Sequence, residues 1–104
     1  MTNKYHARKT YVELCGRTFD SKAESVRGEE LAVLEHYGAI SDLKYQVPFV
    51  LSTKPKVTIT IDFSYIENGE RVYEDVKGML TRDSRTKLAW LEQLHGIKVN
   101  LMKR

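Results

Sequence analysis

The dipeptide Asn68-Gly69 constrains the fold of this chain more than any other feature, because both residues accept the positive φ of a two-residue β-turn. Before it, the odd positions of residues 57–65 are apolar and the even positions are polar, as in a strand with one buried face. The predicted apolar face comprises Val57, Ile59, Ile61, Phe63 and Tyr65. After the turn, residues 70–77 have the length of a return strand, and Gly78 ends it. The sequence therefore predicts an antiparallel β-hairpin.

A first helix is predicted over about residues 21–37. Ser21 and Glu24 have the spacing of a capping box, and Gly38 supplies a C-terminal stop. Ahead of this helix, apolar and polar residues alternate over residues 11–19, which predicts a short hairpin.

A second helix is predicted after the hairpin, with Asp83 or Ser84 as its N-cap and Gly96 at its end. Its expected buried stripe consists of Leu88, Leu91 and Leu94. Further strands are predicted over residues 43–49, where Pro48 favours an edge position or a bulge, and over residues 97–102. The order of elements indicates an α+β fold, with a mixed central β-sheet flanked by helices.

Length and composition indicate one domain over residues 1–104, in which residues 1–10 form a basic flexible arm. No apolar run approaches the roughly 18 residues of a membrane span, so we expect a soluble, cytoplasmic protein without a membrane partner. Cys15, the single cysteine, cannot form an intrachain disulfide and is assigned no chemistry.

The charge balance favours a polyanionic partner. The formal net charge is +3, and basic residues flank a more acidic centre. The candidate DNA-binding residues are Lys4, Arg8, Lys9, Arg82, Arg85 and Lys87. On charge alone, two solvated surface faces explain the same distribution equally well.

The predicted turn brings two acids together. If the loop has two residues, opposed positions across the hairpin place Asp62 opposite Asp75, with their Cβ atoms about 4.5–5.5 Å apart. The strand period of two puts Lys77 on the same face, opposite Thr60. Opposed carboxylates favour a bound cation, and hard oxygen ligands suit Mg²⁺ or Mn²⁺. Spacing alone leaves a second interpretation open, in which Lys77 neutralises an acidic pair on a solvated face.

These residues resemble the signature of the PD-(D/E)XK nuclease superfamily, in which one acid precedes an acid-x-Lys motif on the next strand. The matching blocks are Phe19 to Glu24, Tyr45 to Pro48, Ile61 to Phe63 and Glu74 to Gly78, within a stretch from about Lys4 to Lys98. They are similar to small phage-encoded proteins described as uncharacterised or as endonucleases, and to the end-cutting transposon endonuclease domain. Ile61 stands where the superfamily name has Pro.

The resemblance implies a restriction-endonuclease-like αβββαβ core and an additional acid from the first helix. Glu24 matches that position, with Glu29 and Glu30 as weaker candidates, although a capping box would use the same side chain of Glu24. Asp75 is preferred to Glu74 as the ligand because Glu74 faces the other side of its strand.

Two other residues have roles to weigh. Gln46 matches a position that lies near the active site in the family it resembles. A purely structural role on an edge strand would account for this residue equally well. Trp90 is expected to pack in the core rather than to stack on bases. The histidines have no shared spacing and are assigned no role.

The implied activity is Mg²⁺-dependent endonucleolytic hydrolysis of DNA, with Mn²⁺ as a substitute. Asp62, Asp75 and Glu24 would hold the metal, and Lys77 would assist catalysis. The family analogy indicates branched DNA such as a Holliday junction, and a symmetric cut implies a homodimer. Two alternatives remain: a non-catalytic module that binds DNA or a protein partner in phage recombination or anti-defence, and a nuclease subunit that is active only with a partner.

Overall fold

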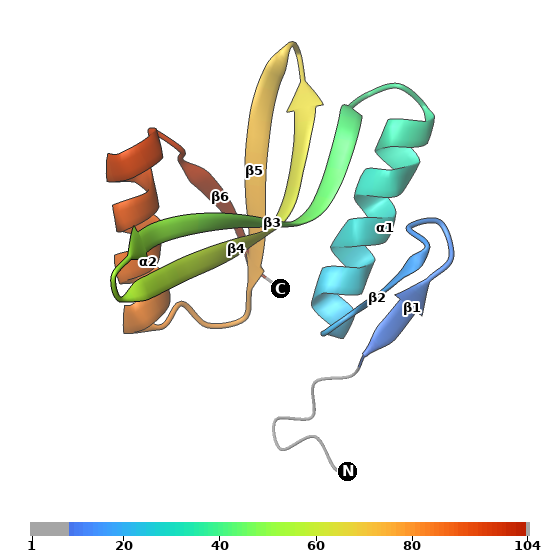
Figure 1. Ribbon diagram of the computed structural model, residues 1–104. Coiled ribbons are helices and arrows are strands. Elements are labelled where there is room, and N and C mark those ends of the chain that lie inside the picture. Colours follow the sequence, from blue (N-terminus) through green and yellow to red (C-terminus); the bar gives the residue numbers. More distant parts are fainter. Residues whose placement is uncertain (1–8, 104) are drawn as a thin grey trace.

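The computed structural model describes residues 9–103, which form six strands and two helices (Figure 1). The elements are β1 (Thr10–Val12), β2 (Arg17–Phe19), α1 (Lys22–His36), β3 (Ser41–Thr53), β4 (Lys56–Glu67), β5 (Glu70–Lys77), α2 (Arg82–His95) and β6 (Val99–Lys103). Residues 1–8, most of the predicted basic arm, lie outside the described residues. The predicted arm also extends too far, because Thr10 already pairs with Phe19 in the first hairpin.

The main sheet has four strands in the order β3-β4-β5-β6. The first three are antiparallel neighbours, and β6 runs parallel to β5 after the crossover through α2. Asn68 and Gly69 have φ values of 53° and 79°, so the predicted two-residue turn joins β4 to β5. The α+β fold with a mixed sheet and two helices is thus confirmed.

Pro48 lies in β3, which is an edge strand of the sheet. An edge strand tolerates the missing N–H of proline because one side of it has no neighbouring strand to satisfy. The strand is longer than predicted, its register shifts between Ser41 and Lys44 and between Val50 and Ser52, and Gln46 has a positive φ of 52°. The sequence prediction of an edge position is therefore confirmed.

The apolar face of β4 is divided between two cores, although a single continuous face was predicted. Phe63 belongs to the core beneath α1, together with Phe19 and Leu31. Ile61, only two residues earlier, belongs to the core beneath α2, together with Leu91. The ribbon of β3 and β4 bends strongly part-way along its length, as Figure 1 shows. Strict alternation cannot predict this change of direction, because it assumes a strand without a bend.

The second helix begins earlier than expected. Thr81 is its N-cap and accepts a hydrogen bond from the Ser84 N–H at 3.1 Å, so the prediction of Asp83 or Ser84 as the cap was wrong. Leu94 is 51% exposed and does not continue the buried stripe, whereas Leu91 is fully buried. The helix packs on the sheet through Leu88, Trp90 and Leu91 instead. In the described part of the chain, no helix has the length and apolar character required to cross a membrane.

Candidate functional site

Asp62 and Asp75 face each other at the point where β4 and β5 diverge. The backbone pairing of these strands runs from Glu67 opposite Glu70 to Phe63 opposite Glu74, which confirms the predicted register. At the next position, backbone-to-carboxylate hydrogen bonds replace the backbone-to-backbone bonds of the sheet. The Asp62 N–H donates to Asp75 Oδ1 at 2.9 Å. The Val76 N–H donates to Asp62 Oδ2, also at 2.9 Å. Each acid therefore holds the opposite strand.

These hydrogen bonds use one oxygen of each carboxylate and leave the other oxygen for a different partner. Asp62 Oδ1 lies 3.5 Å from the amide nitrogen Nε2 of Gln46, which has a positive φ in β3. Asp75 Oδ2 lies 2.8 Å from the Lys77 ammonium. The structure therefore brings Gln46 to the acids, as the sequence suggested, and fixes both carboxylates through the backbone.

Lys77 joins the acids through Asp75 rather than through the cross-strand position predicted for it. Thr60, the expected residue opposite Lys77, pairs with Pro48 of β3. The reason is the divergence of the strands, since the pairing of β4 with β5 ends at Phe63. We call Glu24, Asp62, Asp75 and Lys77 the carboxylate–lysine cluster.

The sequence left two roles open for Glu24, in the helix cap and beside the aspartates. The structure shows both, the first through its backbone and the second through its side chain. Its backbone N–H donates to the N-cap Ser21 Oγ at 3.1 Å, so the backbone satisfies the helix cap. Its side chain is directed to Asp62, and a hydrogen-bonding interaction between the two carboxyl groups contributes to the pKa of Asp62. Glu24 is buried, with 8% of its surface exposed.

The carboxylate–lysine cluster holds more negative charge than its surroundings favour. Burial, followed by the interaction with Glu24, raises the pKa of Asp62 to about 6. Burial likewise raises the pKa of Asp75 to about 6; the Lys77 ammonium opposes this rise and the Asp62 carboxyl reinforces it. Both acids would become more acidic if another cation joined Lys77.

A separate buried network fixes α1 against β5 on the other face of the strand. Arg27 binds both oxygens of Glu74, through Nε to Oε1 and through Nη2 to Oε2 at 3.0 Å. The Tyr65 hydroxyl donates to Glu74 Oε2 at 2.6 Å. Because Arg27 lies one turn after Glu24, this contact also sets where Glu24 meets the sheet. The sequence predicted that Glu74 faces away from Asp75. It did not predict Arg27 and Tyr65 as the partners of Glu74, because no local pattern links these residues.

A glycine completes the close approach of α1. A Cβ atom at Gly28 would lie 2.6 Å from the Phe19 ring, so only glycine lets the helix lie this near to β2. Phe19 is 1% exposed and fills the core beneath α1. The position of the helix, and with it that of Glu24, is thus fixed by packing as well as by the ion pair.

The donor set of the cluster fits a hard divalent cation. In residues 9–103, no three side chains among His, Cys, Asp and Glu already stand in the arrangement of a metal site. The available atoms are nevertheless carboxylate oxygens, which Mg²⁺ and Mn²⁺ prefer. Asp62 and Asp75 each retain one oxygen not bound to backbone, and burial, the largest cause of their raised pKa values, makes a nearby cation favourable. Glu24, Asp62 and Asp75 are the residues that would hold the ion.

The other acids considered on α1 do not join the cluster. Glu29 is exposed. Glu30 is also exposed and forms an ion pair with Arg27 at 3.3 Å. Of the three glutamates weighed from the sequence, Glu24 is therefore the one that the structure brings to Asp62.

The predicted basic residues are spread over separate surfaces. Lys4 and Arg8 lie outside the described residues, and Lys9 is exposed just before β1. Lys87 forms an ion pair with Asp83 at 3.4 Å. Arg82 and Arg85 are exposed on α2. Within the described chain, none of the three basic residues of α2 forms a hydrogen bond or an ion pair with the carboxylate–lysine cluster.

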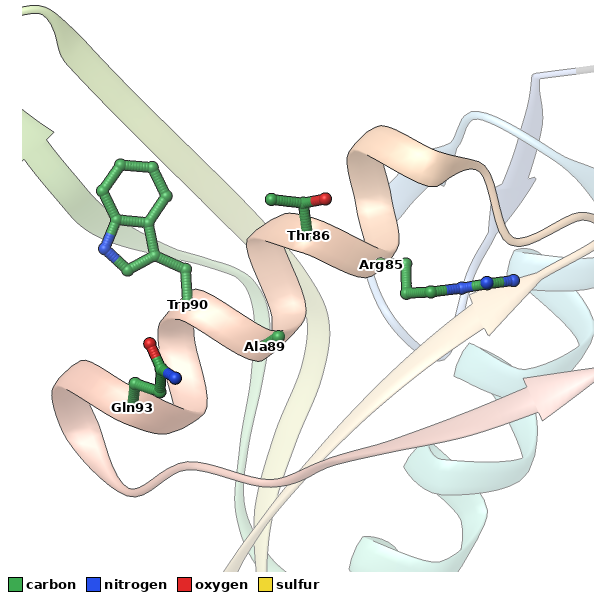
Figure 2. Close-up of a pocket in the computed structure, with 5 residues that line it drawn as sticks. All are labelled: Arg85, Thr86, Ala89, Trp90 and Gln93. Carbon is green, nitrogen blue, oxygen red and sulfur yellow. The ribbon is translucent and has the colours of Figure 1, made fainter.

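Trp90 and Arg85 line opposite ends of one open hollow on α2, together with Thr86, Ala89 and Gln93. Figure 2 shows that the two side chains extend from α2 in different directions. Trp90 is half-buried and packs against the core beneath α2, as expected from the sequence. Arg85 also lines a second hollow beside Lys98. The outer face of α2 is therefore a shallow, mixed surface.

Fold and site together define a small α+β protein that carries a buried carboxylate–lysine cluster where two strands of a mixed sheet separate. The chain belongs to the family described as "Protein of unknown function (DUF1064)", whose model matches residues 2–102. No curated protein matches the chain.

Proposed function

We propose that this protein is a divalent-metal-dependent DNA endonuclease. The observation that carries the proposal is the convergence of Asp62, Asp75, Glu24 and Lys77 where β4 and β5 diverge. Two acids on neighbouring strands with a lysine two residues after the second acid provide ligands for a metal and a cation for phosphate. The resemblance to the PD-(D/E)XK nucleases supports the same conclusion.

Each residue of the cluster has a defined part in this proposal. Asp62, Asp75 and Glu24 would hold Mg²⁺ or Mn²⁺, which when bound supplies Lewis-acid stabilisation of a phosphoryl oxygen and a more acidic water. Lys77 presents an ammonium to the negative charge that develops on the phosphoryl oxygens during hydrolysis. Gln46 orients the second oxygen of Asp62. The backbone bonds of the two aspartates keep their carboxylates in place without rearrangement.

DNA backbone and shape are the features that such a small domain is best suited to recognise. Phosphate contacts position a protein without reading sequence, and the net charge of +3 favours them. Branched DNA, including four-way junctions, is the proposed substrate, by analogy with similar small phage proteins. Symmetric cutting of a junction would require two copies of the chain.

The decisive experiment compares metal-dependent cleavage by wild type and two charge-matched variants. Labelled four-way junction, flap, linear duplex and single-stranded DNA are incubated with Mg²⁺, Mn²⁺ or EDTA. Asp75→Asn removes the proposed ligand, and Asp83→Asn removes an exposed acid on α2 as a control. We expect cutting of a branched substrate by wild type and Asp83→Asn, and none by Asp75→Asn or in EDTA.

The opposite results identify the alternatives. DNA binding without cleavage in either metal would favour a non-catalytic module. Mn²⁺ binding without cleavage would favour a nuclease subunit that needs a partner. Cutting that survives in Asp75→Asn would refute the assignment of the cluster as the active site.

A further inference from the structure

The β3–β4 ribbon continues past the carboxylate–lysine cluster and away from β5. We call residues 47–61, which comprise this ribbon and its turn, the β-arm (Figure 1). Residues on its inner face belong to the core beneath α2, among them Leu51 and Ile61. Phe49 also contacts the rings of Tyr73 and His95, with centroids 5.7 and 5.8 Å away. The β-arm is therefore a braced extension of the sheet.

The opposite face of the β-arm is open. In both strands, every second side chain points to this open face and is exposed. The side chains between them point to the inner face and are half-buried or buried. We define the outer face of the β-arm by the exposed strand residues Pro48, Val50, Lys56, Thr58 and Thr60, together with Lys54, which is exposed in the turn that joins the strands. Asp62 follows Thr60 at the same alternation, so this face leads directly into the carboxylate–lysine cluster.

The charges on this outer face have one sign. Lys54 lies in the turn at the far end and Lys56 begins the strand after it, and neither forms an ion pair with any described residue. Thr58 and Thr60 present hydroxyl groups between those lysines and Asp62. Over residues 47–61, all of which the structure describes, the sequence contains no Asp or Glu. Such a surface complements a polyanion and not a cationic partner.

The length of the outer face matches a segment of DNA. Lys56 lies six residues from Asp62 along β4, which corresponds to about 20 Å at the rise of a β-strand. At 3.4 Å per base pair, this distance spans about six base pairs of duplex. A backbone that has a phosphate at the cluster would therefore reach the lysines about half a helical turn away.

We propose that the outer face of the β-arm binds the DNA backbone beside the cleavage site, with Lys54 and Lys56 contacting phosphates about six base pairs from it. This proposal rests on the proposed function, because it takes the carboxylate–lysine cluster as the place where DNA is cut. The hydroxyl groups of Thr58 and Thr60 line the path between the two positions. The sequence predicted none of these residues as a DNA contact, because it assigned that role to the N-terminal arm and the second helix.

The test measures DNA binding without cleavage, by fluorescence anisotropy of labelled junction and duplex DNA in EDTA at a series of salt concentrations. Lys54→Ala/Lys56→Ala removes two charges from the β-arm. Lys44→Ala/Lys98→Ala removes two exposed charges elsewhere. We expect the slope of log K against log salt to become shallower by about 1.8 in the first variant, at 0.9 per lost phosphate contact. The slope of the control should stay at the wild-type value.

A folding control and three possible outcomes complete the test. Thermal unfolding of both variants confirms that they fold, since all four lysines are exposed. An unchanged slope in Lys54→Ala/Lys56→Ala would overturn the β-arm proposal even if wild type cuts DNA. A shallower slope with no cleavage by wild type would support the β-arm as a DNA surface and contradict DNA cleavage by this chain alone. If the variant instead changes only self-association, measured by sedimentation, the face binds a second copy and the DNA assignment is wrong.

Discussion

Glu74 and Asp75 are neighbours in β5, and both are buried, yet their surroundings differ in charge. Glu74 is 2% exposed and meets the Arg27 guanidinium through both of its oxygens, with the Tyr65 hydroxyl as a further donor. Asp75 is 3% exposed and pairs with the Lys77 ammonium, while the neighbouring carboxyls Asp62 and Glu24 have no ion pair of their own among the described residues. One face of the strand thus has a balanced ion pair, and the other has an excess of negative charge.

This difference separates a structural acid from a functional one. A buried carboxylate with a complete set of partners holds elements together, and removing a partner exposes the full cost of the unpaired charge. Buried carboxylates that lack sufficient positive charge have raised pKa values and favour a cation. By this criterion, Glu74 joins α1 to the sheet, and Asp75 is the acid for which we propose a part in the reaction.

The largest expected effect is on cleavage by Asp75→Asn. Loss of the proposed metal ligand should remove about 4 kcal/mol of transition-state stabilisation, or about 10³-fold in rate. The stability of the metal-free protein should stay the same or increase, because an unfavourable negative charge is lost. Single-turnover cleavage and urea unfolding measure the two quantities. If Asp75→Asn is much less stable than wild type but retains its specific activity, Asp75 is a structural acid and the distinction from Glu74 is wrong.

The next effect is on stability, in Arg27→Met. This change leaves Glu74 buried without its guanidinium partner and should lower the free energy of unfolding by about 3 kcal/mol. Arg27→Met/Glu74→Leu should regain most of the loss, since an apolar pair of similar volume has no charge to solvate. Urea unfolding of both proteins provides the measurement. A single variant as stable as wild type would show that the ion pair contributes little to holding α1.

A smaller effect concerns pH and the two aspartates of the cluster. An unfolded aspartate has a pKa near 3.9, and both folded values are about 6, so the folded protein binds more protons between those limits. The free energy of unfolding of the metal-free protein should therefore fall as pH rises from about 4 to 6. We expect a contribution of about 2 kcal/mol from the pair, after allowance for solvent screening.

The measurement for this pH effect is urea unfolding at pH 4 to 8 in EDTA, with Asp62→Asn/Asp75→Asn as the reference. The difference between the two curves isolates the aspartates from the other carboxyl groups. Excess Mg²⁺ at pH 7.5 should stabilise wild type and leave the reference unchanged. A difference curve that rises with pH would mean that the cluster is not short of positive charge.

The smallest effect is expected for Tyr65→Phe. Its hydroxyl is a donor to Glu74, and burial raises the pKa of Tyr65 to about 12, so it remains protonated. Loss of one hydrogen bond to a charged group should cost about 1.5 kcal/mol of stability. Cleavage should change little, because Arg27 still holds Glu74. If Tyr65→Phe and Arg27→Met lowered the free energy of unfolding equally, no single contact would dominate the network of Arg27, Glu74 and Tyr65.

Local signals predicted most of the fold. The Asn68-Gly69 turn gave the correct register of the central hairpin, and so the meeting of Asp62 with Asp75, because a two-residue loop leaves no other alignment. The pattern after Ser21 gave the first helix with its cap. The position of Lys77 opposite Thr60 was wrong, since it depended on pairing beyond the point where the strands diverge.

The sequence by itself determined the helices, the strands and the central hairpin, because caps, turns and alternation act between residues close in the chain. Only the tertiary structure decided that Glu24 meets Asp62, that Arg27 meets Glu74, and that β4 divides its apolar residues between two cores. These contacts join residues far apart in sequence. They depend on how closely α1 packs and where the β-arm bends, and packing of this kind has no signature in neighbouring residues.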